Sequence, residues 1–270
     1  LKVKLKEIDK NFGFNDLDNK SLPVYNVNYF QDKAFSKIST RSNKFIFKCF
    51  EEALNLIKEK KIEGFINCPV VKETLFKNDY KGVTEYLSNK ISKFNDSAML
   101  IFNKHLSVSP VTTHIPINLI GKQINEKNIV KKVKLINEFY KKFIKKKPKI
   151  AILGLNPHNF YGKNNLNEKK IISNAILKIK KNKIKIIGPL SPDTSFMIAK
   201  KNKFDVIVGM YHDQVLTPFK AIYEFNAINI TLGLPYIRIS PDHGVGENIM
   251  GKGIAKPYSL IEAIKFFNYI

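Results

Sequence analysis

The chain has 270 residues, 44% of them hydrophobic, and a formal net charge of +23. This length and apolar content suffice to bury the core of one large or two modest domains, which excludes a tail or a linker. No apolar run is long enough to span a bilayer, no signal peptide is visible, and two cysteines cannot build a disulfide framework, so we expect a cytoplasmic protein without a membrane partner.

The positive charge raises nucleic acid as a partner, but the residues that carry it argue against that interpretation. Nearly all of them are lysines spread along the chain, and Arg41 and Arg238 are the only arginines. Arginine dominates the bidentate recognition of bases and phosphates. We therefore expect no nucleic-acid partner, and interpret the charge as compositional drift that aids solubility and attracts anionic substrates.

Helical and strand patterns alternate from residue 45 onward. The predicted elements are a helix at Phe45–Lys61, strands at Phe65–Cys68, Ala98–Phe102 and Leu106–Val111, a helix at Ile129–Ile144, a strand at Lys149–Leu155, a helix at Glu168–Ile179, a strand at Ile184–Ile187, a short helix after Asp193, strands at Val206–Met210 and Ala227–Leu232, and a helix at Ser259–Phe267. This alternation is typical of βαβ units and predicts an α/β fold with a largely parallel sheet. The residues before Phe30 carry no clear pattern.

Three of the five histidines, His114, His158 and His212, each follow a predicted strand. Open α/β sheets bind ligands at the carboxyl ends of their strands, so three such ends can bring the imidazoles together. Three protein ligands with an open position describe a catalytic metal site, and imidazole suits a borderline divalent ion. The alternative is that each histidine is a loop residue satisfied by a backbone carbonyl; for all three together we favour the shared metal site.

A second polar group follows the third histidine. Lys220, Asn229 and Arg238 would suit a phosphate, because charged groups and amide donors match its oxygens. Further on, the segment Asp242–Gly253 is rich in glycine, which permits tight turns and close approach of the backbone to a nucleotide. The alternatives are a salt-bridged surface for the first group and a plain surface turn for the second, which does not match the Rossmann fingerprint.

Several short sequence motifs occur in the same order and with the same spacing as in one enzyme family. They are Thr112–Pro116, Gly154–His158, Gly188–Leu190 with Asp193–Thr194, Tyr211–Gln214, Asn229–Arg238 and Asp242–Gly244. In these motifs, from about Phe45 to the C-terminus, the chain resembles the 4-hydroxythreonine-4-phosphate dehydrogenases of pyridoxal phosphate biosynthesis. The resemblance implies an isopropylmalate-dehydrogenase-like α/β fold in which two domains flank a cleft, residues 1–90 with 245–270 and residues 91–244.

The resemblance also implies a homodimer with its site at the subunit interface, and a role for individual residues. His114, His158 and His212 match ligands of a divalent metal, zinc, magnesium or cobalt, shared by both subunits. Thr84, Lys220, Asn229 and Arg238 match residues that bind the phosphorylated substrate. The loop that contains Gly244, Glu247 and Asn248 resembles a cofactor loop for NAD or NADP. Asp193, which matches a residue of the active-site cleft, Asp213 and Lys72 are candidates for the catalytic base.

The reaction implied is the oxidation of 4-phosphooxy-L-threonine, followed by decarboxylation to 3-amino-2-oxopropyl phosphate. Three features depart from the family. Its glycine-rich N-terminal strand and first helix have no counterpart here, Val83 replaces a substrate-binding histidine, and Asn248 replaces an acidic residue that accepts ribose hydroxyls. The last change blurs the preference for NAD over NADP. Two alternatives stay open: a dehydrogenase of erythronate or threonate phosphate, and a truncated, inactive relative.

Overall fold

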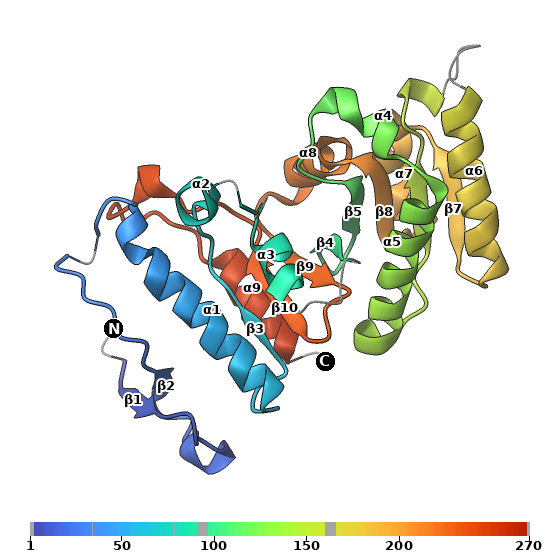
Figure 1. The fold of residues 1–270 in the computed structure, drawn as a ribbon. Coiled ribbons are helices and arrows are strands. Elements are labelled where there is room, and N and C mark those ends of the chain that lie inside the picture. The colour runs from blue at the N-terminus through green and yellow to red at the C-terminus, as the bar shows by residue number, and fades with distance from the viewer. Residues whose placement is uncertain are drawn as a thin grey trace.

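The computed structural model describes residues 3–268 apart from residues 34, 78, 81, 91–96 and 160–165. Within these residues, eight strands form one mixed sheet in the order β3-β10-β9-β4-β5-β8-β6-β7 (Figure 1). Their bounds are β3 Gly64–Ile66, β4 Ala98–Phe102, β5 Ser107–Thr112, β6 Ile150–Leu153, β7 Ile186–Leu190, β8 Val206–Tyr211, β9 Ile228–Leu232 and β10 Ile237–Pro241. A separate parallel pair, β1 (Leu5–Ile8) and β2 (Leu22–Tyr25), stands apart from this sheet.

The helices divide between the two ends of the sheet (Figure 1). Their bounds are α1 Asn43–Lys58, α2 Lys72–Phe76, α3 Val83–Lys90, α4 Ile120–Gln123, α5 Glu126–Phe139, α6 Leu166–Lys181, α7 Pro192–Asn202, α8 His212–Tyr223 and α9 Tyr258–Phe267. Helices α1, α2 and α3 lie beside β3 and β10, α5 packs on β4, β5 and β9, α6 packs on β7, and α7 packs on β6 and β8. The described helices include none that is long and apolar enough to cross a membrane.

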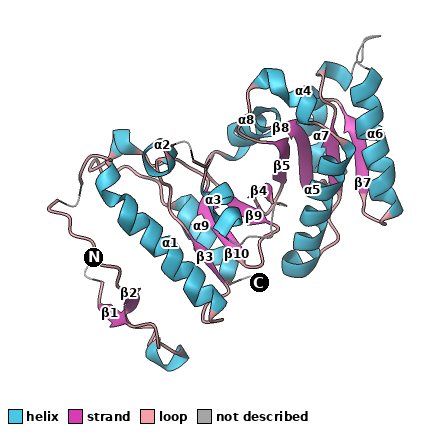
Figure 2. Ribbon diagram, in the orientation of Figure 1, coloured by secondary structure: helices cyan, strands magenta, loops and turns pink. Residues whose placement is uncertain are grey.

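Strands β6 and β8 are buried on both faces, because helices lie on both sides of this part of the sheet (Figure 2). In β6, Ile150 and Ile152 pack in one core cluster with residues of α5 and α6. The alternate residues, Ala151 and Leu153, pack in a second cluster with residues of α7 and α8. Successive side chains of a strand point to opposite faces, so an uninterrupted apolar run is what a strand buried on both faces requires.

A third core cluster, rich in aromatic side chains, joins α1, α2 and α3 to the other end of the sheet. Phe50 and Leu54 of α1 pack here with Phe76 and Tyr86, and Tyr236 joins them from the connection before β10. The rings of Phe76 and Tyr86 have their centroids 5.6 Å apart. This cluster fixes α3, whose first turn carries Thr84, against the sheet.

Most of the predicted elements are present, and several begin or end within a few residues of their predicted bounds. The predicted strand Ala98–Phe102 has the bounds of β4, and the helix predicted at Ile129–Ile144 is α5 continued by a π-helical turn, Tyr140–Ile144. The prediction missed β1 and β2, the helices α2, α3, α4 and α8, and strand β10. Strand β10 was overlooked because the segment was interpreted only as a binding motif.

The prediction of a largely parallel sheet was wrong in its centre. Strand β9 runs antiparallel to both β10 and β4, and β4 runs antiparallel to β5. Residues 103–106 alone connect β4 to β5, and residues 233–236 alone connect β9 to β10. Connections this short join antiparallel neighbours, because a parallel crossover needs a dozen residues or more. The two-domain division stays a prediction, since its boundary at 90/91 touches residues outside those described.

Candidate active site

The three histidines follow three adjacent strands. Strand β8 lies between β5 and β6 and runs parallel to both, so the carboxyl ends of all three lie at one edge of the sheet. His114 follows β5, His212 begins α8 directly after β8, and His158 lies in a short turn after β6. The edge predicted from the sequence therefore exists, and each of the three histidines lies at it.

Side chains at this edge form two pairs. The ring centroids of His114 and His212 are 5.7 Å apart. His158, whose side chain is 78% exposed, has its Nδ1 3.1 Å from Asp193 Oδ2 at the start of α7. His212 Nδ1 also lies 2.8 Å from Asp213 Oδ1. Within the described part of the chain, no three histidine, cysteine or acidic side chains form a metal-binding group, so one subunit does not bring the three imidazoles together.

A buried glutamine holds the strand ends in place. The side-chain amide of Gln214 donates to the carbonyl of Gly154, at 2.8 Å, and its oxygen accepts from the backbone N–H of Met210, at 2.7 Å. The hydroxyl of Thr112 donates to the carbonyl of Met210, at 2.8 Å. Gln214 and Thr112 thus tie the ends of β5, β6 and β8 together, and the turns that carry the histidines start from fixed positions.

A cavity of about 470 Å³ opens beside His114 and His212. Seven of the predicted functional side chains line it together with Gly244: His114, His212, Thr84, Lys220, Asn229, Arg238 and Lys72. Val83 also lines this cavity while it packs into the aromatic cluster of α1 to α3. His158, Asp193 and Asp213 are not among its lining residues. The structure therefore unites the predicted substrate residues with two of the three predicted metal ligands.

Arg238 is the most deeply buried cation of this cavity, with 4% of its surface exposed. Its Nε donates to Asn67 Oδ1, at 2.7 Å, and its Nη1 donates to Thr231 Oγ1, at 3.0 Å. Thr84 Oγ1 lies 3.4 Å from the same Nη1. Burial lowers the pKa of Arg238 to about 10. No carboxylate of the described residues lies within 4.0 Å of the guanidinium, so neutral groups orient a charge that lacks a counter-ion.

Lys220, in contrast, has an anionic partner. Its Nζ lies 3.1 Å from Asp242 Oδ2 and donates to the backbone carbonyl of Asp242, also at 3.1 Å. Burial raises the pKa of Asp242, and the nearby Lys220 opposes that rise. The backbone N–H of Asp242 donates to Ser259 Oγ, at 2.8 Å, which anchors the start of the glycine-rich loop. Lys220 is thus held in place by the residue that leads into this loop.

One cavity residue, Lys132 of α5, was missed by the sequence analysis. Burial lowers the pKa of Lys132 to about 8, and its Nζ donates to the carbonyl of Ser97, at 2.5 Å. A signal was present in the sequence, because Lys132 stands three residues after Ile129 and four before Ile136, on the apolar face of α5. A lysine at such a position reaches the interior of the protein.

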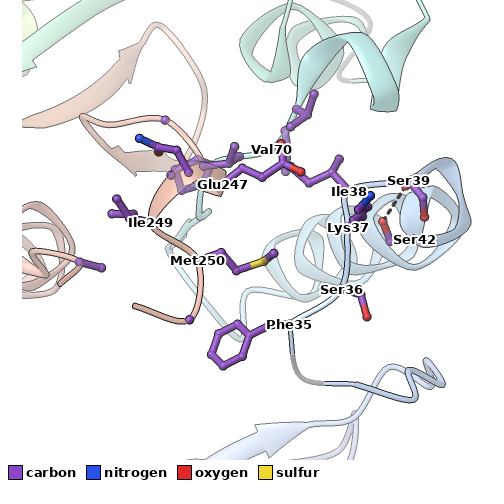
Figure 3. A pocket seen from close by; sticks show the side chains of 18 of the residues that line it. Phe35, Ser36, Lys37, Ile38, Ser39, Ser42, Val70, Glu247, Ile249 and Met250 are labelled. Atoms are coloured by element: carbon purple, nitrogen blue, oxygen red, sulfur yellow. Dashed lines mark hydrogen bonds between the residues drawn. The ribbon is translucent and has the colours of Figure 1, made fainter. Parts of the chain in front are cut away.

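A larger cavity, of about 1180 Å³, lies between the glycine-rich loop and the segment that precedes α1. Figure 3 shows Glu247, Ile249 and Met250 of the loop across from Phe35 and Ile38 of that segment. Gly246, Gly251 and Gly253 have φ angles of +65°, +74° and +67°, which side chains of L residues rarely adopt, so the loop needs glycine there. Gly244, Glu247 and Asn248 all line this cavity.

The two cavities adjoin each other. Pro69, Val70, Phe225, His243 and Gly244 line both of them. A small polar ligand in the 470 Å³ cavity would therefore lie close to a larger ligand in the other. The larger cavity combines apolar side chains with backbone that can approach a ligand closely, which fits a nucleotide with an aromatic ring.

Comparison with known sequences gives a family and named relatives. The family model for the pyridoxal phosphate biosynthetic protein PdxA matches residues 1–267. The chain is 42% identical, over 97% of its length and 81% of the relative's, to the 4-hydroxythreonine-4-phosphate dehydrogenase of a Sulfurihydrogenibium species. It is 32% identical, over 84% of its length and 71% of the relative's, to the D-threonate 4-phosphate dehydrogenase of Pectobacterium atrosepticum. The family match begins at residue 1, well before the start predicted near Phe45.

Comparison with solved structures supports the same fold. The crystal structure of 4-hydroxythreonine-4-phosphate dehydrogenase from Klebsiella pneumoniae superposes with a TM-score of 0.81 at 28% identity, covering 98% of this chain and 82% of its own. A β-decarboxylating dehydrogenase from Thermococcus kodakarensis gives a TM-score of 0.51 at 13% identity, covering 82% of this chain and 72% of its own, which concerns the fold alone. The predicted isopropylmalate-dehydrogenase-like α/β fold is confirmed.

Proposed function

Because this chain belongs to the family of the pyridoxal phosphate biosynthetic protein PdxA, we propose that it oxidises 4-phosphooxy-L-threonine with NAD or NADP and that the product loses carbon dioxide to give 3-amino-2-oxopropyl phosphate. The observation that carries this proposal is the 470 Å³ cavity, which joins Thr84, Lys220, Asn229 and Arg238 to two of the three predicted metal ligands. A cytoplasmic location is proposed with it.

The charge of this cavity suits a phosphorylated acid. Its lining includes four cations, Lys72, Lys132, Lys220 and Arg238, and two carboxylates, Glu85 and Asp242. With neutral histidines this leaves a formal excess of two positive charges. Arg238 offers hydrogen-bond donors in a fixed planar arrangement, which matches phosphate or carboxylate oxygens. A substrate with both a phosphate and a carboxylate would balance this excess of positive charge.

The donor set also fits a divalent metal, provided that two subunits share the site. His114 and His212 of one subunit are close enough to act as a pair, and the exposed His158 of a second subunit would complete the set. Imidazole suits zinc or cobalt better than magnesium, which prefers oxygen ligands. When bound, such an ion would lower the pKa of the substrate hydroxyl and polarise the ketone formed from it. We propose a homodimer for this reason.

The choice of the general base depends on which candidate side chain can reach the substrate. Lys72 lines the cavity, whereas Asp213 is 79% exposed and lies outside it. Asp193 pairs with His158, so in a dimer it would enter the site together with that histidine. We propose Lys72 of one subunit or Asp193 of the other as the group that accepts the hydroxyl proton, and regard Asp213 as a partner that orients the His212 ring.

The nicotinamide cofactor would occupy the 1180 Å³ cavity. Its apolar side chains, among them Ile38, Val70 and Ile249, offer contact area to flat rings, and the glycines let the backbone approach the ribose and phosphates. The wall shared with the substrate cavity, which includes Phe225 and Gly244, supports hydride transfer between neighbouring ligands. Asn248 carries no charge that would repel the 2′-phosphate of NADP, so we propose that both cofactors are accepted.

The test is to incubate the metal-loaded protein with NAD or NADP and each candidate substrate, and to follow the absorbance of the reduced cofactor and the release of carbon dioxide. We expect turnover with 4-phosphooxy-L-threonine. Turnover only with threonate or erythronate 4-phosphate would assign the chain to the alternative substrates, of which the first is favoured by the Pectobacterium relative. Absence of turnover with all three would identify an inactive relative.

A further inference from the structure

Lys132 occupies a position on α5 where an apolar residue would be expected. Ile129, Val133 and Ile136, which are three residues before it, one after it and four after it, are fully buried in the main core cluster. Along an α-helix this spacing places all four side chains on one face. Lys134, two residues further on, is exposed. The lysine at 132 is therefore turned toward the interior. Desolvation of its charge lowers the stability of the fold unless a partner or a ligand compensates for it.

The amine of Lys132 reaches the same part of the cavity as Arg238. Lys132 donates to the carbonyl of Ser97, the residue before β4. In the sheet, Met99 of β4 is paired with Thr231 of β9, and the Thr231 hydroxyl accepts from Arg238. Burial lowers the pKa of both Lys132 and Arg238, and the charge of Glu85 on α3 opposes this lowering in both, so one carboxylate acts on both cations. The two cations thus lie around one corner of the cavity.

Among the residues that the structure describes, neither cation has a carboxylate close enough for an ion pair. Among the described residues, no carboxylate oxygen lies within 4.0 Å of Lys132 Nζ or of the Arg238 guanidinium. The ammonium of a lysine has three donors, and Ser97 accepts from one of them. The Arg238 donors meet neutral oxygens of Asn67 and Thr231. A buried arginine and a half-buried lysine, both incompletely neutralised at one corner of a cavity, point to an anionic ligand.

We propose that Lys132 and Arg238 together bind the phosphate group of the substrate, with the Thr84 hydroxyl as a neutral donor beside them. A phosphate dianion needs two positive charges and several donors, and this corner supplies both. Thr84 Oγ1 lies 3.4 Å from Arg238 Nη1, and the neighbouring Val83 is apolar and supplies no charge. The identity of the ligand as a phosphorylated acid rests on the proposed function.

The first experiment measures binding of inorganic phosphate to the intact, metal-loaded protein by isothermal titration calorimetry. Lys132→Met keeps the length of the side chain and removes its charge, and we expect it to weaken phosphate binding by about 10- to 100-fold. Lys132→Arg keeps the charge and should retain most of the affinity. Lys134→Met is the matched control, because it removes a lysine from the exposed face of the same helix. Circular dichroism verifies that each variant is folded.

A pH series adds a measurement that a merely structural role of Lys132 would not change. The ammonium carries its charge below a pKa of about 8, so wild-type affinity for phosphate should fall as the pH rises from about 8 to 9. Arg238, with a pKa of about 10, stays charged in this range. The other charged groups that act on Lys132 are Glu85 of α3 and Lys131 of its own helix. The phosphate affinity of Lys132→Met should not show this decline with pH.

Steady-state kinetics separates this inference from the proposed function. If the proposed function holds, Lys132→Met should raise the KM for the phosphorylated substrate more than it lowers kcat. Phosphate binding by the wild-type protein without any turnover would refute the proposed function and leave the role of Lys132 intact. Equal phosphate affinity of Lys132→Met and wild type, or no phosphate binding by the wild type, would overturn the role of Lys132.

Discussion

The two cavities of this protein are built in opposite ways. In the substrate cavity, the charged groups are buried or half-buried, and hydrogen bonds orient the deepest of them, as Asn67 and Thr231 do for Arg238. In the larger cavity, the walls are loop segments whose apolar side chains are largely exposed, with Phe35 at 67% and Ile254 at 62%. The first cavity is therefore preorganised, whereas the second gains much of its contact area only when a ligand covers these side chains.

This difference predicts that substitutions in the two cavities have effects of different size. A change in the substrate cavity removes an interaction whose geometry the sheet has already fixed, so it should lower affinity or turnover strongly. A change in the larger cavity alters a loop that can adjust, so it should have a smaller effect and act on the cofactor alone. The four predictions below test this contrast.

The largest effect is expected for His212→Ala. It removes one imidazole of the proposed metal site, so stoichiometric binding of a divalent metal should be lost and kcat/KM should fall by more than about 100-fold. His105→Ala is the control, because His105 lies in the connection that precedes β5, at the opposite end of that strand from His114. Metal content is measured by atomic emission after dialysis. Full metal occupancy in the His212 variant would refute the shared site.

The next effect is expected for Arg238→Met. The variant removes a buried charge without leaving a large void, so the protein should remain folded while phosphate affinity falls by about 10- to 100-fold. Arg238→Lys keeps the charge but loses the planar arrangement of donors. Its phosphate affinity should therefore lie between those of the wild type and Arg238→Met. Titration calorimetry with inorganic phosphate measures the affinity. Wild-type affinity in Arg238→Met would show that the preorganised corner is not the anion site.

A smaller effect is expected for Gly246→Ala in the cofactor loop. Gly246 has a φ of +65°, and an added Cβ would also lie 3.3 Å from Ile249 Cγ1. The strain is about 1 kcal/mol, which should raise the KM for the cofactor about fivefold and leave the KM for the substrate unchanged. Gly121→Ala in α4, where φ is not positive, is the control. A change confined to the substrate KM would contradict the assignment of the two cavities.

The smallest effect is expected for Asn248→Asp. The new carboxylate would accept ribose hydroxyls of NAD and repel the 2′-phosphate of NADP, so the ratio of kcat/KM for NAD over NADP should rise. The site is exposed and screened by water, which limits the rise to about fivefold. Initial rates with both cofactors measure the ratio. An unchanged ratio would show that residue 248 does not face the ribose.

Much of the fold could be predicted from the sequence because its signals are local. The apolar run Ile150–Leu153 and the helical spacing of Ile129, Val133 and Ile136 report burial directly, and both elements are present. The direction of β9 was mistaken, because pairing across the sheet depends on residues far apart in the chain. The short connection at residues 233–236 was the local signal that could have corrected it.

In the candidate site, too, some features could be predicted from local sequence and others depended on packing. The order of residue types by itself determined which side chains are candidates for chemistry: three histidines after strands, a lysine, an asparagine and an arginine after the third, and glycines in a loop. These are local properties, since a strand end or a left-handed turn is specified by its own residues. The family resemblance named Thr84, Lys220, Asn229 and Arg238 as candidate substrate residues, and the structure places all four in one cavity.

Only the tertiary structure decided how these groups combine. It placed His114 beside His212 but His158 beside Asp193, and it turned Lys132 toward the corner occupied by Arg238. The physical reason is that burial and proximity arise from packing between distant segments. Whether a lysine keeps an ordinary pKa or carries a costly buried charge depends on neighbours such as Ser97 and Glu85, which lie 35 and 47 residues before Lys132.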